Sequence, residues 1–210
     1  MRSSSPSPRR AYWLRTLHQW HWVSAAISLT GMILFSITGI TLNNAAWIES
    51  SATTTRRQLT LPPELLQDIP ENTDNSAVHM ALPLALERHL NQFLGIRIDG
   101  RQAEISSDEI YLSLPQPGAD AWLAIERDTG ALEYEKRSRG WIAYFNDLHK
   151  GRHAGRAWSW FLDLFAISCL IFSISGLLLM KTHAANRPST WPLLGFGALA
   201  PLLLMLLFIH

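Results

Sequence analysis

Residues 23–46 read VSAAISLTGMILFSITGITLNNAA and carry no charged side chain. Two stretches of similar length follow: residues 158–180, where Asp163 is the single charge, and residues 188–210, where only the last histidine can be charged. About 20 residues of α-helix, rising about 1.5 Å each, cross a hydrocarbon core about 30 Å thick. One such stretch could be a buried core helix. Three of them in 210 residues predict three transmembrane helices.

The composition excludes several classes of protein. The formal net charge of +1 argues against nucleic-acid binding, which needs a clustered basic face. Cys169 is the single cysteine, so an internal disulfide and a Cys-x-x-Cys metal site are excluded. The sequence has no GxGxxG, P-loop or HExxH motif, so any electrons would come from a membrane quinol or a partner protein.

Most tryptophans lie near the ends of the three stretches, as in an aromatic belt: Trp13, Trp20, Trp22, Trp47, Trp158, Trp160 and Trp191.

Basic residues predict the orientation in the membrane. The tail before the first stretch carries four arginines and no acid, and the loop after the second carries Lys181 and Arg187 and no acid. Lysine and arginine near a span stay on the cytoplasmic side, so both segments are expected there. Residues 49–157 carry 16 acids and 12 bases and are expected on the periplasmic or extracellular side. A cleaved signal peptide is the rival explanation of the first stretch, but its apolar part is long and residues 43–46 make a poor cleavage site.

The predicted fold is an α-helical membrane protein whose three spans carry a small α+β domain between the first and the second. Within that domain, helical spacing predicts a helix over 76–95, interrupted by Pro83, and strand-like runs cover 95–106, 109–114 and 121–134. About 60 residues are few for an independent core, so docking on the membrane helices or on a second copy would help it. The expected segments are a tail (1–15), a first span (16–46), a linker (47–58), the domain (59–140), an interfacial segment with the second span (141–181), a loop (182–190) and a third span (191–210).

Residues 127–132, RDTGAL, together with the helix and strands before them, resemble a PepSY domain. The flanking segments 17–22, LHQWHW, and 147–153, DLHKGRH, resemble the span entrances of the PepSY-associated transmembrane family. The resemblance covers residues 12–181 and implies a bacterial inner-membrane protein related to haem-containing reductases of ferric siderophores. Reductases of that kind are longer, with four or more spans, so their full haem complement does not carry over to this chain.

The histidines are the candidate ligands of a haem iron. His18 and His21 are spaced i, i+3 before the first span, and His149 and His153 are spaced i, i+4 before the second, so each pair would share one face of a helix. Axial ligands approach haem from opposite faces, so each pair can offer only one of them, and the other must come from a second helix or subunit. The weaker candidates that would complete two ligand planes, one near each membrane face, are His183 and His210.

A short internal repeat links the first two spans. Residues 35–39, FSITG, recur as residues 172–176, FSISG, near the opposite end of the second span. With the predicted topology, this indicates an inverted pair of spans, a pattern that places functional sites symmetrically about the membrane midplane. The alternative is that small residues only let the helices approach each other closely.

Together with the resemblance, these observations predict one or two b-type haems that transfer electrons across the inner membrane to a periplasmic acceptor. The resemblance implies a ferric siderophore as one such acceptor. Three spans are half of a larger reductase core, so a homodimer or a heteromeric partner is expected. The basic residues Lys150, Arg152 and Arg156 could pair with haem propionates, an anionic iron chelate or lipid headgroups. Asp163 is an acid inside a span, and such residues are candidates for a functional role. The alternative is a structural ion pair with Arg156. The competing hypothesis is a haem-free PepSY module that binds or regulates a partner protein.

Overall fold

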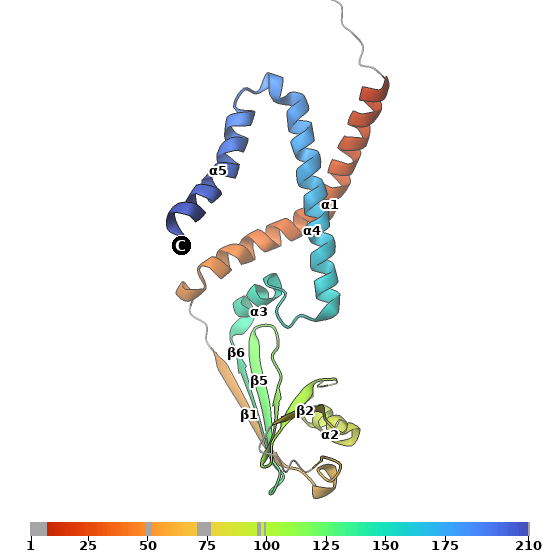
Figure 1. The fold of residues 1–210 in the computed structure, drawn as a ribbon, viewed down its shortest axis with the longest axis vertical. Helices are drawn as coiled ribbons and strands as arrows, with labels where there is room; N and C mark the ends of the chain where they lie inside the picture. Colours follow the sequence, from red (N-terminus) through yellow and green to blue (C-terminus); the bar gives the residue numbers. More distant parts are fainter. Residues whose placement is uncertain (1–7, 49–51, 71–76, 96–97, 99, 210) are drawn as a thin grey trace, which may run out of the picture. The chain divides into compact units, whose positions relative to one another are not determined.

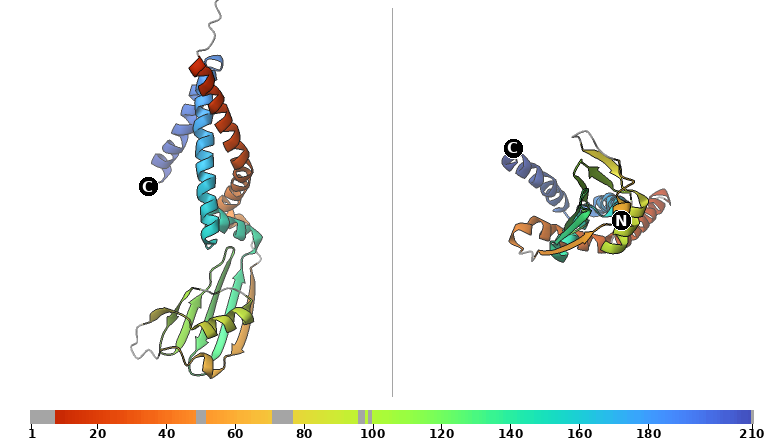
Figure 2. Two further views of the ribbon diagram at one scale, coloured as in Figure 1. Left: turned by 90° about the vertical axis from the view of Figure 1, so that its right-hand side faces the viewer. Right: turned by 90° about the horizontal axis from the view of Figure 1, so that it is seen from below.

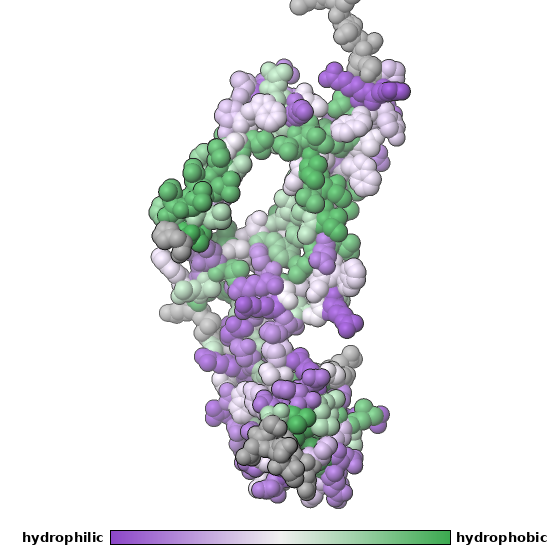
Figure 3. All heavy atoms as spheres, viewed as in Figure 1, coloured by the Kyte–Doolittle hydropathy of each residue, from purple (hydrophilic) through white to green (hydrophobic). Residues whose placement is uncertain are grey.

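Three long apolar helices dominate the computed structural model, which describes residues 8–48, 52–70, 77–95, 98 and 100–209. They are α1 (Pro8–Asn43), α4 (Gly155–His183) and α5 (Thr190–Phe208) (Figure 1). All three are long and apolar enough to cross a membrane, and Figure 3 shows hydrophobic side chains gathered over them. The predicted three spans are therefore confirmed by length and composition.

The chain divides into two compact units. One comprises Met1–Leu34 and Trp160–His210, and the other comprises Phe35–Ser159, so α1 and α4 each contribute to both. In the first unit, α1 and α4 approach closely through small residues. Ser168 of α4 donates a hydrogen bond of 3.3 Å to the carbonyl oxygen of Ser24, and Gly31 lies against the ring of Phe165. Inside a membrane the hydrophobic effect does not drive helices together. Side chains of this size instead let two helix backbones pack closely enough for van der Waals contacts to hold them.

The second unit contains an antiparallel sheet with strand order β1-β6-β5-β4-β3-β2. One face of the sheet packs against α2 (Leu84–Leu94), whose buried residues are Leu86, Leu90 and Leu94 (Figure 2). Alternate residues of β4 and β5 point into the same core, including Leu112, Leu123 and Ile125, as the two-residue period of a strand requires. The strands are β1 (Thr53–Thr60), β2 (Val78–Ala81), β3 (Gln102–Ile105), β4 (Glu109–Ser113), β5 (Ala119–Glu126) and β6 (Ala131–Ser138).

The sheet corrects several expectations. The expected helix over 76–95 is strand β2 followed by α2, because Pro83 has a fixed φ and stands as the N-cap at which the helix begins. The strand-like run 121–134 contains a turn signal at residues 128–130, and this turn is confirmed: the run is the hairpin of β5 and β6, and Gly130 has a φ of +68°. The expected linker 47–58 overlaps β1, a polar and mostly exposed edge strand whose composition is that of a loop.

The expected interfacial segment and second span, 141–181, comprise two helices. Helix α3 (Gly140–His149) ends before α4 begins at Gly155. His153 lies in the connection between them with a φ of 55°, in the left-handed region that non-glycine residues rarely adopt. His149 and His153 therefore do not share a face of one helix, contrary to the expectation.

Candidate functional site

His21 of α1 lies against the second copy of the repeated motif, residues 172–176 in α4. Its Nδ1 is 3.0 Å from the hydroxyl of Ser175 and 3.2 Å from the carbonyl oxygen of Phe172. The imidazole stacks on the Phe172 ring, with centroids 4.7 Å apart and planes at 15°. A Cβ built on Gly176 would lie 3.1 Å from Cε1 of His21, so the glycine lets the ring sit directly on the helix.

His149, the last residue of α3, lies against the first copy of the motif, residues 35–39 in α1. Its Nδ1 is 2.7 Å from the hydroxyl of Thr38, and its ring meets the edge of Phe35 with centroids 5.0 Å apart. A Cβ on Gly39 would lie 3.6 Å from Cε1 of His149. The first, fourth and fifth residues of each motif copy thus contact one histidine.

The two histidines therefore share one local environment, although they lie in different units of the chain. Each is half-buried, each Nδ1 is engaged by a buried hydroxyl, and each Cε1 faces a glycine. No hydrogen bond involves Nε2 of either ring within the part of the chain that the structure describes. Nε2 is the nitrogen that an imidazole with an engaged Nδ1 can offer to a metal.

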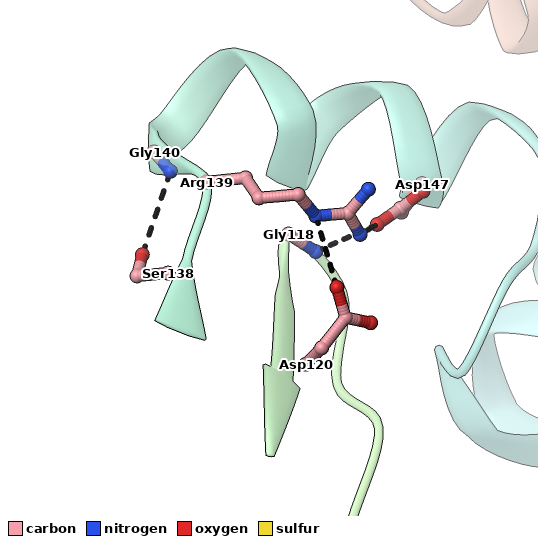
Figure 4. A network of polar contacts seen from close by, with 6 residues as sticks. All are labelled: Gly118, Asp120, Ser138, Arg139, Gly140 and Asp147. Carbon is pink, nitrogen blue, oxygen red and sulfur yellow. Dashed lines mark hydrogen bonds and ion pairs between the residues drawn. The ribbon is translucent and has the colours of Figure 1, made fainter. Parts of the chain in front are cut away.

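Two further contacts position His149 by fixing α3. Thr41, one turn after Thr38 in α1, donates a hydrogen bond of 2.8 Å to the side-chain oxygen of Asn146. Asp147, buried beside it, accepts a bond of 2.9 Å from the backbone N–H of Gly118 and a bond of 2.8 Å from Arg139 (Figure 4). Because Asn146 and Asp147 are held on both sides, the C-terminal turn of α3 presents His149 in a set orientation.

A profile of the PepSY_TM-like family matches residues 12–210. The chain belongs to the PepSY_TM-like family. The match includes both motif copies and both histidines, and with the three apolar helices it makes the chain a membrane protein. Neither a curated protein nor a solved structure matches this PepSY_TM-like chain.

The remaining candidate histidines of the PepSY_TM-like protein are placed differently. His18 is exposed on α1, with its Nδ1 2.8 Å from the carbonyl oxygen of Leu14 in its own helix. His183, the last residue of α4, is exposed, and its Nδ1 is 2.9 Å from the carbonyl oxygen of Leu179. His153 is exposed in the connection before α4, and His210 lies outside the described residues. Within each predicted pair, the structure brings only His21 and His149 to a motif of another helix.

The other charged candidates are all at the surface. Lys150, Arg152 and Arg156 are exposed around the connection between α3 and α4. Asp163 is exposed on α4 and makes no ion pair with any residue in the described ranges. Among those residues, no group of three or more His, Cys, Asp or Glu side chains is arranged to hold a free metal ion. A single imidazole with an open Nε2 is a ligand set for a metal that already has other ligands, as haem iron has.

Each unit also has a hollow lined in part by tryptophan side chains. In the first unit, a cavity of about 430 Å³ lies between α1 and α4 and includes Trp13, Trp20, Ile174 and Ser175, the residue that contacts His21. In the second unit, a hollow of about 650 Å³ lies over β1, β4, β5 and β6. It is lined by Trp122, which stacks on Tyr111, and by three carboxylates, those of Glu109, Glu126 and Glu133.

Proposed function

We propose that the protein binds b-type haem through His21 and His149 and passes electrons across the bacterial inner membrane to a periplasmic acceptor such as a ferric siderophore. The observation that carries this proposal is the state of the two rings: Nδ1 is engaged by a hydroxyl of another helix, while Nε2 has no protein partner in the described chain. Haem-ligating histidines commonly bind through one nitrogen while the other donates a hydrogen bond that orients the ring.

The residues present fit such a group. Haem, when bound, supplies an iron that accepts and releases one electron at a time. The protein's contribution is to hold the two imidazoles: Phe172 and Phe35 limit the tilt of the rings, and the motif glycines leave room for them. Each ring would hold the iron through one nitrogen, so ligation of one iron by two histidines would need a second side chain from another helix or another subunit. This requirement supports a homodimer or a heteromeric partner.

The proposed topology follows from charge. The arginine-rich segment before α1 and the loop with Lys181 and Arg187 would be cytoplasmic, and the sheet unit, a PepSY-like domain, would be periplasmic. His21 would then belong to a cytoplasmic-side site and His149 to a periplasmic-side site. The exposed Lys150, Arg152 and Arg156 follow His149 closely in the chain and supply positive charge for propionates or an anionic iron chelate.

The absorption spectrum of the purified full chain tests this proposal. We expect a Soret band and an α band on reduction with dithionite, and we expect His21→Ala and His149→Ala each to remove one of two haems. The matched controls are His18→Ala and His153→Ala, which remove exposed rings of the same pairs and should retain both. A wild-type protein without a Soret band, or one whose spectrum neither His21→Ala nor His149→Ala alters, would contradict haem binding at these residues.

A second candidate function is a haem-free module that binds a partner protein. The observation that favours it is the hollow on the face of the sheet opposite α2, where Trp122 and the carboxylates of Glu109, Glu126 and Glu133 suit a basic segment. A lysine-rich decapeptide is a direct probe. Salt-sensitive binding that Glu126→Gln weakens, in a protein that lacks a Soret band, would favour this function over electron transfer.

A further inference from the structure

We propose that Thr38 and Ser175, the fourth residues of the two motif copies, are positioning residues that hold His149 and His21 as the tautomer with the proton on Nδ1. Each ring then presents the Nε2 lone pair outward as a ready ligand. The identity of the ligand as haem iron rests on the proposed function, whereas the tautomer itself does not.

The hydrogen-bond donors around His21 determine where its proton lies. The carbonyl oxygen of Phe172 can only accept hydrogen bonds, and it lies 3.2 Å from Nδ1, so this contact requires a proton on Nδ1. The hydroxyl of Ser175 has one proton, which it donates to the same carbonyl over 3.0 Å. Its lone pairs are therefore free to accept from Nδ1–H at 3.0 Å. Both contacts of Nδ1 agree on the same tautomer.

In the described chain, Nδ1 of His149 contacts the hydroxyl of Thr38 and no carbonyl oxygen, so the direction of that hydroxyl decides its tautomer. The hydroxyl proton of Thr38 is donated to the carbonyl oxygen of Phe35 over 3.2 Å, the residue three positions before it. The hydroxyl then accepts from Nδ1–H of His149 over 2.7 Å. In each motif copy, the helix's own carbonyl orients the hydroxyl, and the hydroxyl orients the histidine. A neutral imidazole held in this way keeps its Nε2 lone pair free for a metal.

The spacing within the motif explains why these positions act together. The first, fourth and fifth residues are related as i, i+3 and i+4 and lie on one face of a helix, where they contact the ring. The second residues, Ser36 and Ser173, are exposed on another face and make no hydrogen bond to either histidine in the described chain. Each motif copy therefore contains its own matched control: a second hydroxyl that does not touch the ring.

Imidazole ¹⁵N NMR on the full chain in detergent, purified without haem, tests the proposal. We expect Nδ1 to be protonated and Nε2 unprotonated in His21 and His149, which single histidine substitutions identify in the spectrum. Ser175→Ala should shift only His21, and only partly, toward the other tautomer, because the carbonyl oxygen of Phe172 still accepts from its Nδ1–H. Thr38→Val removes the hydroxyl that contacts Nδ1 of His149 and should convert only that ring to a mixture of tautomers. Ser175→Thr and Thr38→Ser should restore the wild-type signals, and Ser173→Ala and Ser36→Ala should leave them unchanged. A proton on Nε2 in the wild type, or tautomers that do not respond to the two substitutions, would overturn the proposal.

Titration of hemin into the same proteins separates this inference from the proposed function. Removing a partner of a metal-bound histidine typically weakens metal affinity about 10–100-fold. We expect that loss at one site in Ser175→Ala and at the other in Thr38→Val, with recovery in the conservative variants. If the wild type binds no hemin, the proposed function fails while the tautomer result stands on its own. If the wild type binds hemin and the variants bind it equally well, the positioning role is wrong and the proposed function is unaffected.

Discussion

The backbone N–H of Gly118 donates a hydrogen bond of 2.9 Å to the carboxylate of Asp147, and the same carboxylate oxygen accepts a bond of 2.8 Å from Arg139. The side chain of Asp147 is 6% exposed, while that of Arg139 is 39% exposed. Asp147 therefore joins the turn before β5, the residue before α3 and the end of α3 in one contact. Two positions further along α3 is His149, so this carboxylate also contributes to the placement of the candidate ligand.

We expect Asp147→Asn to destabilise the sheet unit, because it replaces one charged acceptor of two hydrogen bonds by a neutral amide. Hydrogen bonds to charged groups contribute about 1.5–3 kcal/mol each, and the exposure of Arg139 places the expected loss at about 1–3 kcal/mol. Asp120→Asn is the control, because Asp120 is 67% exposed and 3.5 Å from Arg139. Thermal unfolding in detergent measures both. Equal stability of the two variants would show that the bond to Gly118 contributes little.

Gly118 itself allows the close approach of α3 to the sheet. Its φ is +67°, and a Cβ on it would lie 2.6 Å from the Cα of Tyr144, a backbone atom that cannot rotate away. We expect Gly118→Ala to cost about 2–4 kcal/mol, since overpacking and a left-handed alanine both contribute. Gly100→Ala isolates the backbone contribution, because Gly100 has a φ of +71° and nothing within 4 Å of its Cβ position. A similar melting temperature for the two variants would exclude a steric role for Gly118.

Gly31 has the corresponding role where α1 meets α4. A methyl group at this position would overlap the ring of Phe165, which is part of the facing helix. We expect Gly31→Ala to lower the thermal stability of the protein in detergent by about 1–3 kcal/mol, the usual cost of overpacking. Gly197→Ala in α5 is the control, because nothing lies within 4 Å of its Cβ position.

Adding Phe165→Leu to Gly31→Ala should recover part of the loss, because the smaller side chain vacates the space of the ring. Double-mutant coupling of this kind is expected only for residues in contact. If the two substitutions are additive, the close approach of α1 and α4 at Gly31 is not what stabilises the pair.

The sequence predicted the three spans, and the reason is local. Residues 23–46 lack charge over the length of a membrane, and that property needs no tertiary information. The edge strand β1, in contrast, is polar or charged at every position from Thr53 to Thr60 except Leu59. It is ordered by its pairing with β6, from which it is separated by about 70 residues in the chain. Its sequence has no apolar alternation because most of its side chains face solvent.

Which histidine of each pair contacts a motif copy depends on residues that are far away in the sequence. His18 and His21 have equivalent spacing to the span, and only the contact of His21 with Ser175, 154 positions away, distinguishes them. His149 is distinguished from His153 by Thr38, 111 positions away. The repeat FSITG and FSISG was visible in the sequence, and the structure brings one histidine against each copy. Its pairing with histidines could not be inferred, because nothing in either copy specifies which helix faces it.

Tyr134 of β6 gives the sheet unit a predictable response to alkaline pH. The side chain is buried in the core, and burial raises its pKa above the ordinary value of 10.0, with the positive charge of Arg57 opposing the change. Below pH 10 the tyrosine is protonated in both the folded and the unfolded chain, so it adds no pH dependence there. Above pH 10 the unfolded chain loses this proton first, and the free energy of unfolding falls as the pH rises toward the higher pKa of the folded state. We expect Tyr134→Phe to remove this part of the decline in the free energy of unfolding. Thermal unfolding between pH 8 and pH 11, a range of about one to two units either side of the ordinary tyrosine pKa, measures it. A parallel decline in both proteins would assign the alkaline instability to other groups.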